Sequence, residues 1–297
     1  MKTVAALIKR NTKLFFKDKG MFFTSLITPA ILLVLYATFL AKVYRDSFTA
    51  GFPEGLLSED LINGLVGGQL ISSILAVSCI TVAFCSNMLM VQDKANGSIR
   101  DLTISPVKSS HLAIAYYVST LISTLIVCFT ATAICLAYIA YVGWYMSALD
   151  LILLLLDVVL LVMFGTALSS VVGFFMTTQG QISAVGSMVS SMYGFISGAY
   201  MPISQFAEGL QMVISLLPGT YGTSLVRNHA MQGVFLEMKE QGIPEEVLNT
   251  LKGVTDCNIS FFGNTVPIWA MYAVLCGSTA ALLTVYVMLN KHVKKKN

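Results

Sequence analysis

The sequence predicts an all-α integral membrane protein with six transmembrane helices. The chain of 297 residues is 56% hydrophobic and only 11% charged, whereas a typical soluble domain is about 25% charged. Six apolar stretches are each long enough to cross a hydrocarbon core of about 30 Å, which needs about twenty helical residues. They are too long and too continuous to be barrel strands. The predicted spans are residues 21–41, 66–90, 112–138, 151–176, 182–200 and 266–290.

The distribution of charge predicts which side of the membrane each loop faces. Thirteen of the eighteen Lys and Arg residues lie in the N-terminal segment, in the loop of residues 91–111 and in the C-terminal tail. Eleven of the fifteen acidic residues lie on the opposite side. Because Lys and Arg accumulate in cytoplasmic loops, we expect both termini and the 91–111 loop to be cytoplasmic. The chain is then a multi-pass protein of the cell (plasma) membrane, and we expect a bacterial cell.

The first twenty residues predict an amphipathic helix ahead of the first span. Lysines and Arg10 occupy one helical face, and apolar side chains occupy the other, namely Val4, Leu7, Ile8, Leu14 and Phe15. This pattern favours a helix that lies in the cytoplasmic headgroup layer. The alternative is a basic tail that only sets the topology. We therefore divide the chain into this helix, residues 1–20, and a single transmembrane domain, residues 21–297.

The segment of residues 201–265 is the largest one predicted on the outer side. Its first part, from Pro202 to Pro218, is apolar but too short and too interrupted to span, so it predicts a re-entrant or interfacial hairpin. Its later part, roughly residues 235–252, is acidic and favours helix, and Pro244 divides it into two short pieces.

The loop between the second and third spans predicts a short, capped helix. It reads NGSIRDLTISPVKSSH, in which Ser98 and Asp101 form a capping box with negative charge at the helix start. Pro106 disfavours helical geometry just before it, so the helix ends there. A plain connector needs neither caps nor a helix, so the pattern indicates a lever that moves two long helices, with Ile99 and Leu102 as its contact face. The alternative is an anchor on the membrane surface.

Two rows of small residues run along the fifth predicted span. One row recurs every fourth residue from Gly186 to Gly198, and a row of serines lies beside it. Small residues at this spacing let helices approach closely in lipid, and hydroxyl groups can bond across the contact. The rows predict either packing within one bundle or a subunit interface that also lines a substrate pathway. The candidate residues are Gly186, Ser187, Ser190, Ser191, Met192, Gly194 and Gly198.

Asp157 places an acidic side chain inside the fourth predicted span. A carboxylate there costs roughly 2.5–3.5 kcal/mol on insertion scales, so we expect it to face the bundle or a hydrated interface. It is either a hydrogen-bonded structural acid or a proton or ion site. The second reading makes the chain a self-sufficient secondary transporter or channel, a class that usually shows several intramembrane charges or broken helices in matching halves.

Motifs for catalysis and metal binding are missing from the sequence. It contains no phosphate-binding loop and no dinucleotide fingerprint, and its three histidines are scattered without metal-ligand spacing. We therefore expect no catalytic residue, no metal, no cofactor bound by this chain and no nucleic-acid partner. Any ATP hydrolysis has to come from another chain.

Taken together, these features resemble the membrane subunits of type-2 ATP-binding-cassette (ABC) exporters. The resemblance covers nearly the whole chain, although the residues before the loop, Asp93-Lys94-Ala95-Asn96, depart from the acidic lead-in that family members often show. It rests on Arg10, Asp18, Pro29, the loop from Gly97 to Val107, Ser197-Gly198, Pro202, Leu217-Pro218, Tyr221 and Arg227.

The resemblance implies a second permease subunit, identical or paralogous, in the bilayer and a separate pair of ABC ATPase subunits that bind ATP and Mg. The cargo is expected to be a hydrophobic or amphipathic molecule such as a drug or antibiotic, a lipid, a peptide or a glycan. The outer hairpin would help to close an external gate at Pro202, Pro218 and Tyr221. The loop would couple to the ATPase through Gly97, Ser98, Ile99, Arg100, Asp101, Leu102 and Pro106.

Overall fold

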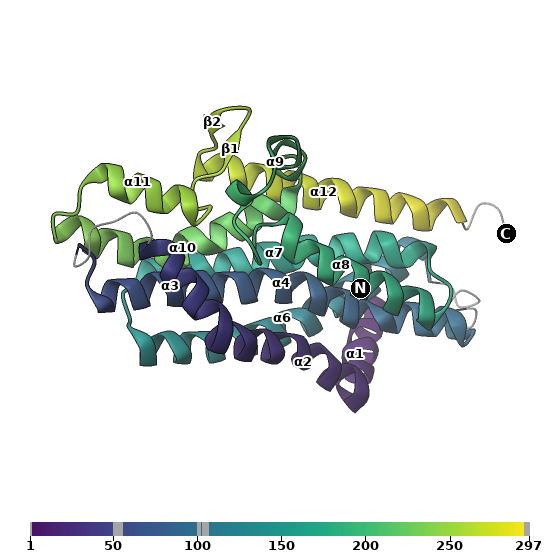
Figure 1. Cartoon of the computed structure of the whole chain (residues 1–297). Coiled ribbons are helices and arrows are strands. Elements are labelled where there is room, and N and C mark those ends of the chain that lie inside the picture. Colours follow the sequence, from purple (N-terminus) through teal and green to yellow (C-terminus); the bar gives the residue numbers. More distant parts are fainter. Residues whose placement is uncertain (1, 50–55, 100–101, 103–106, 294–297) are drawn as a thin grey trace.

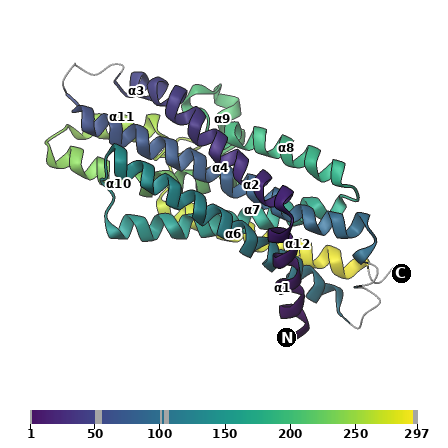
Figure 2. The same cartoon turned by 90° about the horizontal axis from the view of Figure 1, so that it is seen from below.

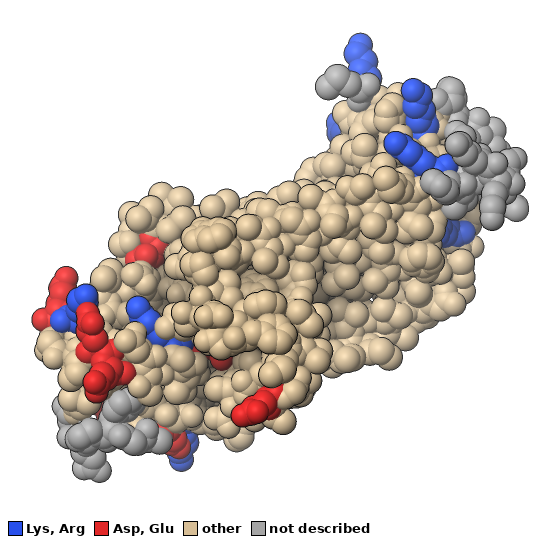
Figure 3. Space-filling model, turned by 90° about the horizontal axis from the view of Figure 1, so that it is seen from above, with Lys and Arg blue, Asp and Glu red and all other residues tan. Residues whose placement is uncertain are grey.

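The computed structural model is an elongated bundle of long helices that run side by side (Figure 1). It describes residues 2–49, 56–99, 102 and 107–293. Apart from a two-stranded hairpin, the described elements are helices, as the predicted all-α class requires. The two ends of the bundle differ in charge: Figure 3 shows Lys and Arg at one end, most of the Asp and Glu together with a few Lys and Arg at the other, and a broad uncharged surface between them. We refer to them as the basic end and the acidic end.

The central element is α4 (Glu59–Ala95), which begins after the capping residue Ser58. Almost all of its side chains from Leu61 to Val91 are buried, because α6, α7, α8 and α10 pack around it. A helix with protein neighbours on several sides has no polar face to offer solvent. The continuous apolar sequence of α4, which includes the second predicted span, therefore forms the core of the bundle.

The first span is preceded by α1 (Lys2–Lys17), which runs across the direction of the long helices at the basic end (Figure 2). Leu7, Asn11 and Phe15 form its buried face, and α1 packs mainly on α6. The apolar face of the predicted amphipathic helix therefore contacts protein. Its position in a headgroup layer stays a prediction.

The first span is a continuous helical run that changes geometry near its middle. It consists of α2 (Lys19–Leu35), a π-helical turn η1 (Tyr36–Leu40) and α3 (Ala41–Thr49). Asp18 caps α2 by accepting the N–H of Met21 at 3.1 Å. The run packs on α4 with one face, and its other face leaves large apolar side chains such as Phe23 and Ile31 exposed.

The third and fourth predicted spans are α6 (Ser109–Val142) and α7 (Ala148–Phe175). α7 begins with a complete capping box between Ser147 and Asp150. The fifth and sixth predicted spans correspond to α8 (Gln179–Ile196) and α12 (Ile268–Val293).

Five of the described helices are long and apolar enough to cross a membrane, and α8 is not among them. The predicted count of six spans is therefore not confirmed. α8 is short and contains many serine and glycine residues, which lower its hydropathy without adding charge.

The segment from residue 201 to 265 differs most from its prediction. It contains η2 (Ile203–Gln205), α9 (Glu208–Ser215), α10 (Pro218–Glu240), α11 (Glu245–Val254) and a hairpin of β1 (Ser260–Phe261) and β2 (Asn264–Thr265). The break at Pro244 lies between α10 and α11, as predicted. The sequence did not predict α10 as one long helix, which is largely buried against α4, α7 and α12.

Candidate functional site

The loop that follows α4 begins at Gly97 at the basic end. Gly97 has a φ of +77°, a left-handed conformation that glycine adopts without strain at the end of a helix. Ser98, Ile99 and Leu102 have helical conformation. The remaining candidate coupling residues, Arg100, Asp101 and Pro106, lie outside the described residues, so the predicted capping box stays a prediction.

The described apolar side chains of this loop pack onto the bundle. Ile99 and Leu102 are partly buried against a cluster that includes Leu7 of α1 and Leu112 and Tyr116 of α6. Ile99 and Leu102 of the loop, α1 and the beginning of α6 therefore form one packed group, which we call the basic-end unit. The contact face predicted for a partner is at least partly occupied by the chain itself.

A charged contact fixes α1 to the last turn of α4. The guanidinium of Arg10 donates to both carboxylate oxygens of Asp93, at 2.8 and 3.3 Å, and the Tyr116 hydroxyl donates to the same carboxylate at 2.6 Å. Asp93 is 6% exposed, and its hydrogen bond raises the pKa of Arg10. Three helices, α1, α4 and α6, therefore meet at one carboxylate that lies four residues before Gly97.

The neighbouring Lys94 fixes α4 to the end of α7. Its ammonium group donates to the carbonyl oxygens of Gly173 at 3.0 Å and Phe174 at 2.7 Å. Helix C-termini present unpaired carbonyl groups, and a lysine there satisfies them and complements the helix dipole. The segment of residues 93–96 departs from the acidic lead-in of the family, and both of its charged side chains, Asp93 and Lys94, make contacts inside the chain.

The two small-residue rows of α8 lie on different faces. Gly194 and Gly198 are buried and Gly186 is partly buried: a side chain at Gly194 would meet the ring of Tyr200, and one at Gly186 would meet Phe84 of α4. Ser190 is part-buried and donates to the Gly186 carbonyl at 2.7 Å. By contrast, an exposed stripe consists of Ser183, Ser187, Met188, Ser191, Met192 and Phe195. The glycine row packs within the chain, and the serine and methionine stripe is left outside.

The segment between Pro202 and Pro218 contains η2 and α9 and is fastened to the first turn of α10, whereas a re-entrant or interfacial position for it stays a prediction. The Tyr221 hydroxyl donates to the carbonyl of Ser215 at 2.5 Å, and Thr220 Oγ1 donates to the carbonyl of Ile214 at 2.9 Å. Pro218 is the first residue of α10, where its missing N–H costs nothing. Tyr221 is buried, while Pro202 and Pro218 are partly exposed.

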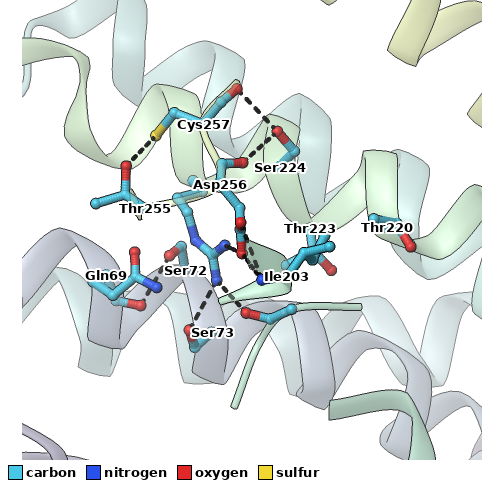
Figure 4. A network of polar contacts seen from close by, with 12 residues as sticks. Gln69, Ser72, Ser73, Ile203, Thr220, Thr223, Ser224, Thr255, Asp256 and Cys257 are labelled. Carbon is cyan, nitrogen blue, oxygen red and sulfur yellow. Dashed lines mark hydrogen bonds and ion pairs between the residues drawn. The ribbon is translucent and has the colours of Figure 1, made fainter. Parts of the chain in front are cut away.

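A buried ion pair connects α10 to the turn after α11 (Figure 4). Arg227 is 0% exposed; it donates to Asp256 Oδ2 at 3.2 Å, to the Gly198 carbonyl at 2.9 Å and to Ser73 of α4 at 3.3 Å. The Asp256 carboxylate also accepts the N–H of Ile203, at 2.9 and 3.1 Å. One arginine thus joins α4, the end of α8 and the α11 turn.

Asp256 is held in this network at a conformational and electrostatic cost. Its φ is +52°, a left-handed conformation that residues other than glycine rarely adopt. Burial raises the pKa of Asp256 to about 6, although Arg227 and the Ile203 N–H act in the opposite direction. The Ser224 hydroxyl donates to the Asp256 carbonyl at 2.9 Å and thereby fixes the strained turn to α10.

Asp157 faces the inside of the bundle. It is 0% exposed, and each of its carboxylate oxygens has a partner: His229 Nδ1 of α10 lies 2.5 Å from Oδ2, and the Tyr272 hydroxyl of α12 donates to Oδ1 at 2.6 Å. The carboxylate therefore joins three helices, α7, α10 and α12, as expected for a hydrogen-bonded structural acid.

Comparison with protein families decides the class of the molecule. The family model of the ABC-2 type transporter matches residues 2–230, which covers α1 through most of α10. The chain belongs to the ABC-2 type transporter family. As an ABC-2 membrane component it is the permease part of an ABC transporter, is embedded in a membrane and works with an ATPase partner. No curated protein matches the chain.

The ABC-2 match includes the basic-end unit, the α8 rows and Arg227, but it ends before Asp256. In the described part of the chain, no group of three His, Cys, Asp or Glu residues is placed to hold a metal ion. Sequence reasoning did not find the partners Asp93, Tyr116, Lys94 and Asp256. Two signals were available: Asp93 is one of only three acids on the basic side in the sequence, and Arg10 is the single arginine among the lysines of α1.

Proposed function

We propose that the chain is the permease subunit of an ATP-driven exporter and that the basic-end unit couples it to a separate pair of ATPase subunits. The observation that carries this proposal is the carboxylate of Asp93, which joins α1, α4 and α6 immediately before the coupling loop of residues 97–107. A displacement of this unit by the ATPase would move α4 and α6 together, and these are the two longest of the described helices.

The exposed stripe of α8 supports a pathway formed with a second permease, either an identical copy or a paralogue. Its serine hydroxyls and flexible methionine side chains suit a hydrophobic or amphipathic cargo such as a drug, lipid, peptide or glycan. Of the predicted interface and pathway residues, Ser187, Ser191 and Met192 are exposed, with Met188 beside them, and they are our main candidates. Gly186, Ser190, Gly194 and Gly198 are partly or fully buried within the chain.

The fastened hairpin of α9 and the start of α10 supports an external gate at Pro202, Pro218 and Tyr221. This segment lies near the middle of the bundle's long axis, close to the start of α12 (Figure 1), and the bonds of Tyr221 and Thr220 tie it to the first turn of α10. A secondary transporter driven by Asp157 is not favoured, since both oxygens of that carboxylate are engaged by neighbouring helices.

Co-purification with the ATPase tests the coupling proposal. We expect an affinity-tagged permease to retain its ATPase from detergent extracts, and deletion of residues 99–105 to abolish retention. Leu102→Asp places a charge against the apolar cluster of the basic-end unit and is expected to weaken retention, whereas a mild change at the exposed Lys108, Lys108→Gln, is the matched control in the same loop. If the ATPase is still retained after the deletion while the permease remains monodisperse, the loop is not the docking element.

A further inference from the structure

A cavity of about 390 Å³ lies between α8 and the pair α7 and α12. Phe164 and Leu168 of α7, Ile196 of α8, and Ala281 and Leu282 of α12 line it, and Leu217 closes it at the start of α10. α8 packs mainly on α4. The cavity therefore occupies the place where a closely packed bundle would have α8 in contact with its other neighbours.

The hydroxyl groups around the cavity are not available to an occupant. Tyr193 donates to the Gly219 carbonyl at 3.0 Å, Thr220 donates to Ile214, and Ser278 donates to the Leu275 carbonyl at 3.0 Å. Ser197 also lines the cavity, but its hydroxyl oxygen is buried and contributes no exposed polar surface. An occupant therefore meets hydrocarbon surface only, and a polar or charged molecule would lose its hydration without compensation.

The cavity opens beside exposed apolar side chains of a helix that is able to cross a membrane. Ala281, at its rim, is exposed on α12, a helix that is long and apolar enough to cross a membrane. Val274 and Val285 on the same helix are also exposed. Protein interiors lose dispersion contacts when a void of this size stays empty, and the nearest molecules are lipid chains.

We propose that the hydrocarbon chain of a membrane lipid occupies this cavity and supports α8. An apolar cavity of about 150 Å³ binds one benzene molecule, so a cavity of about 390 Å³ has room for roughly fifteen carbon atoms by the same measure. The proposal depends on the chain's being embedded in a membrane. It does not depend on which cargo the transporter carries.

The site is placed to affect the gate region, because its wall includes the contact between α8 and α10. Gly219 has no side chain, and a Cβ there would lie 2.5 Å from the ring of Tyr193. The Tyr193 hydroxyl bond to the Gly219 carbonyl thus depends on this close approach. A lipid chain that fills the cavity supports the contact between Tyr193 and Gly219 and keeps α8 apart from α12.

Fluorescence quenching by brominated lipid tests the proposal. The two native tryptophans, Trp144 and Trp269, are replaced by phenylalanine, and a single tryptophan is introduced as Phe164→Trp in the cavity wall. Phe84→Trp is a buried control away from the cavity, and Val285→Trp is an exposed control on α12. Each protein is reconstituted in vesicles of phosphatidylcholine with normal or mid-chain-brominated acyl chains.

We expect the bromine atoms to quench Phe164→Trp at least half as strongly as Val285→Trp and far more strongly than Phe84→Trp. Narrowing the mouth with Ala281→Phe should reduce the quenching of Phe164→Trp to the level of the buried control. Quenching of Phe164→Trp no stronger than that of Phe84→Trp overturns the proposal. The same insensitivity to bromine is expected if a side chain of a second copy fills the cavity, and it overturns the proposal as well.

Leu168→Trp provides a second wall probe if Phe164→Trp does not fold. No ATPase, cargo or transport enters this measurement. A failure of the proposed coupling function would therefore leave the quenching result unchanged, and the two proposals can fail separately.

Discussion

Arg10 and Asp93 form an ion pair between the first helix of the chain and the last turn of its central helix, with 2.8 Å between Arg10 Nη1 and Asp93 Oδ2. The pair lies at the base of the loop that follows α4, and the Tyr116 hydroxyl completes it. Local movement of α1 is thereby tied to the position of the loop.

Removing the guanidinium with Arg10→Met should release α1. Asp93 would keep one partner in a buried position, and an incompletely paired buried polar group costs about 1–3 kcal/mol. We expect faster amide hydrogen exchange across residues 2–17. Lys9→Met, at the adjacent exposed position, should leave the exchange unchanged, and equal exchange in the two variants would contradict the assignment.

Lys94→Met should lower the thermal stability of the isolated permease. The substitution leaves the carbonyl groups of Gly173 and Phe174 without their donor, at a cost of about 1–3 kcal/mol. Lys108→Met removes a charge from an exposed position nearby and serves as the comparison. An unchanged melting temperature for Lys94→Met would show that water replaces the ammonium group.

The Arg227–Asp256 pair should behave as a buried ion pair in a double-mutant cycle. Removing one partner alone, as in Arg227→Met, leaves a buried carboxylate uncompensated and is expected to cost about 3–5 kcal/mol. The double variant Arg227→Met/Asp256→Leu should cost less than the sum of the two single changes. Strict additivity in thermal unfolding would mean that the two groups do not interact.

Asp256 should also make stability depend on pH. Its pKa of about 6 in the folded protein lies above the unfolded value of about 3.9, so the folded state binds the proton more tightly between these values. The stabilisation of the folded state by protonated Asp256 is therefore fully present below about pH 4 and is lost as the pH rises through about 6. We expect the wild type to lose stability over this window relative to Asp256→Asn, which has no group to titrate there. If the stabilities of the wild type and Asp256→Asn change with pH in the same way, Asp256 does not titrate in this window.

A methyl group at Gly233 should be poorly tolerated. A Cβ there would lie 1.9 Å from the carbonyl oxygen of Tyr145, a backbone atom that cannot turn away, so Gly233→Ala should destabilise the protein by about 1–3 kcal/mol. Gly253 of α11 has open space around it, and Gly253→Ala should be neutral or stabilising by up to about 1 kcal/mol. Similar melting temperatures for the two variants would contradict the close contact between α10 and the loop before α7.

Apolar runs predicted the long helices well, because burial in lipid or in the bundle demands the same composition. The sequence did not predict α10 as a buried helix, because its Arg227 and His229 are polar. Both are nevertheless buried against partners that come from distant parts of the sequence. Likewise, helical spacing identified two small-residue rows on α8, but only the positions of Phe84 and Tyr200 decide which row packs inside. Pairing partners depend on the fold, and no local pattern records them.

The length of α4 has a mechanical consequence. At 37 residues it is about 55 Å long and carries no proline that could act as a hinge. Asp93 near one end and Ser73, which contacts Arg227, are therefore fixed on the same stiff rod. From Asp93 to Ser73 the helix extends over about 30 Å. A tilt of about 5° at the basic end therefore displaces the residue that contacts Arg227 by about 2.6 Å, which is close to the length of a hydrogen bond.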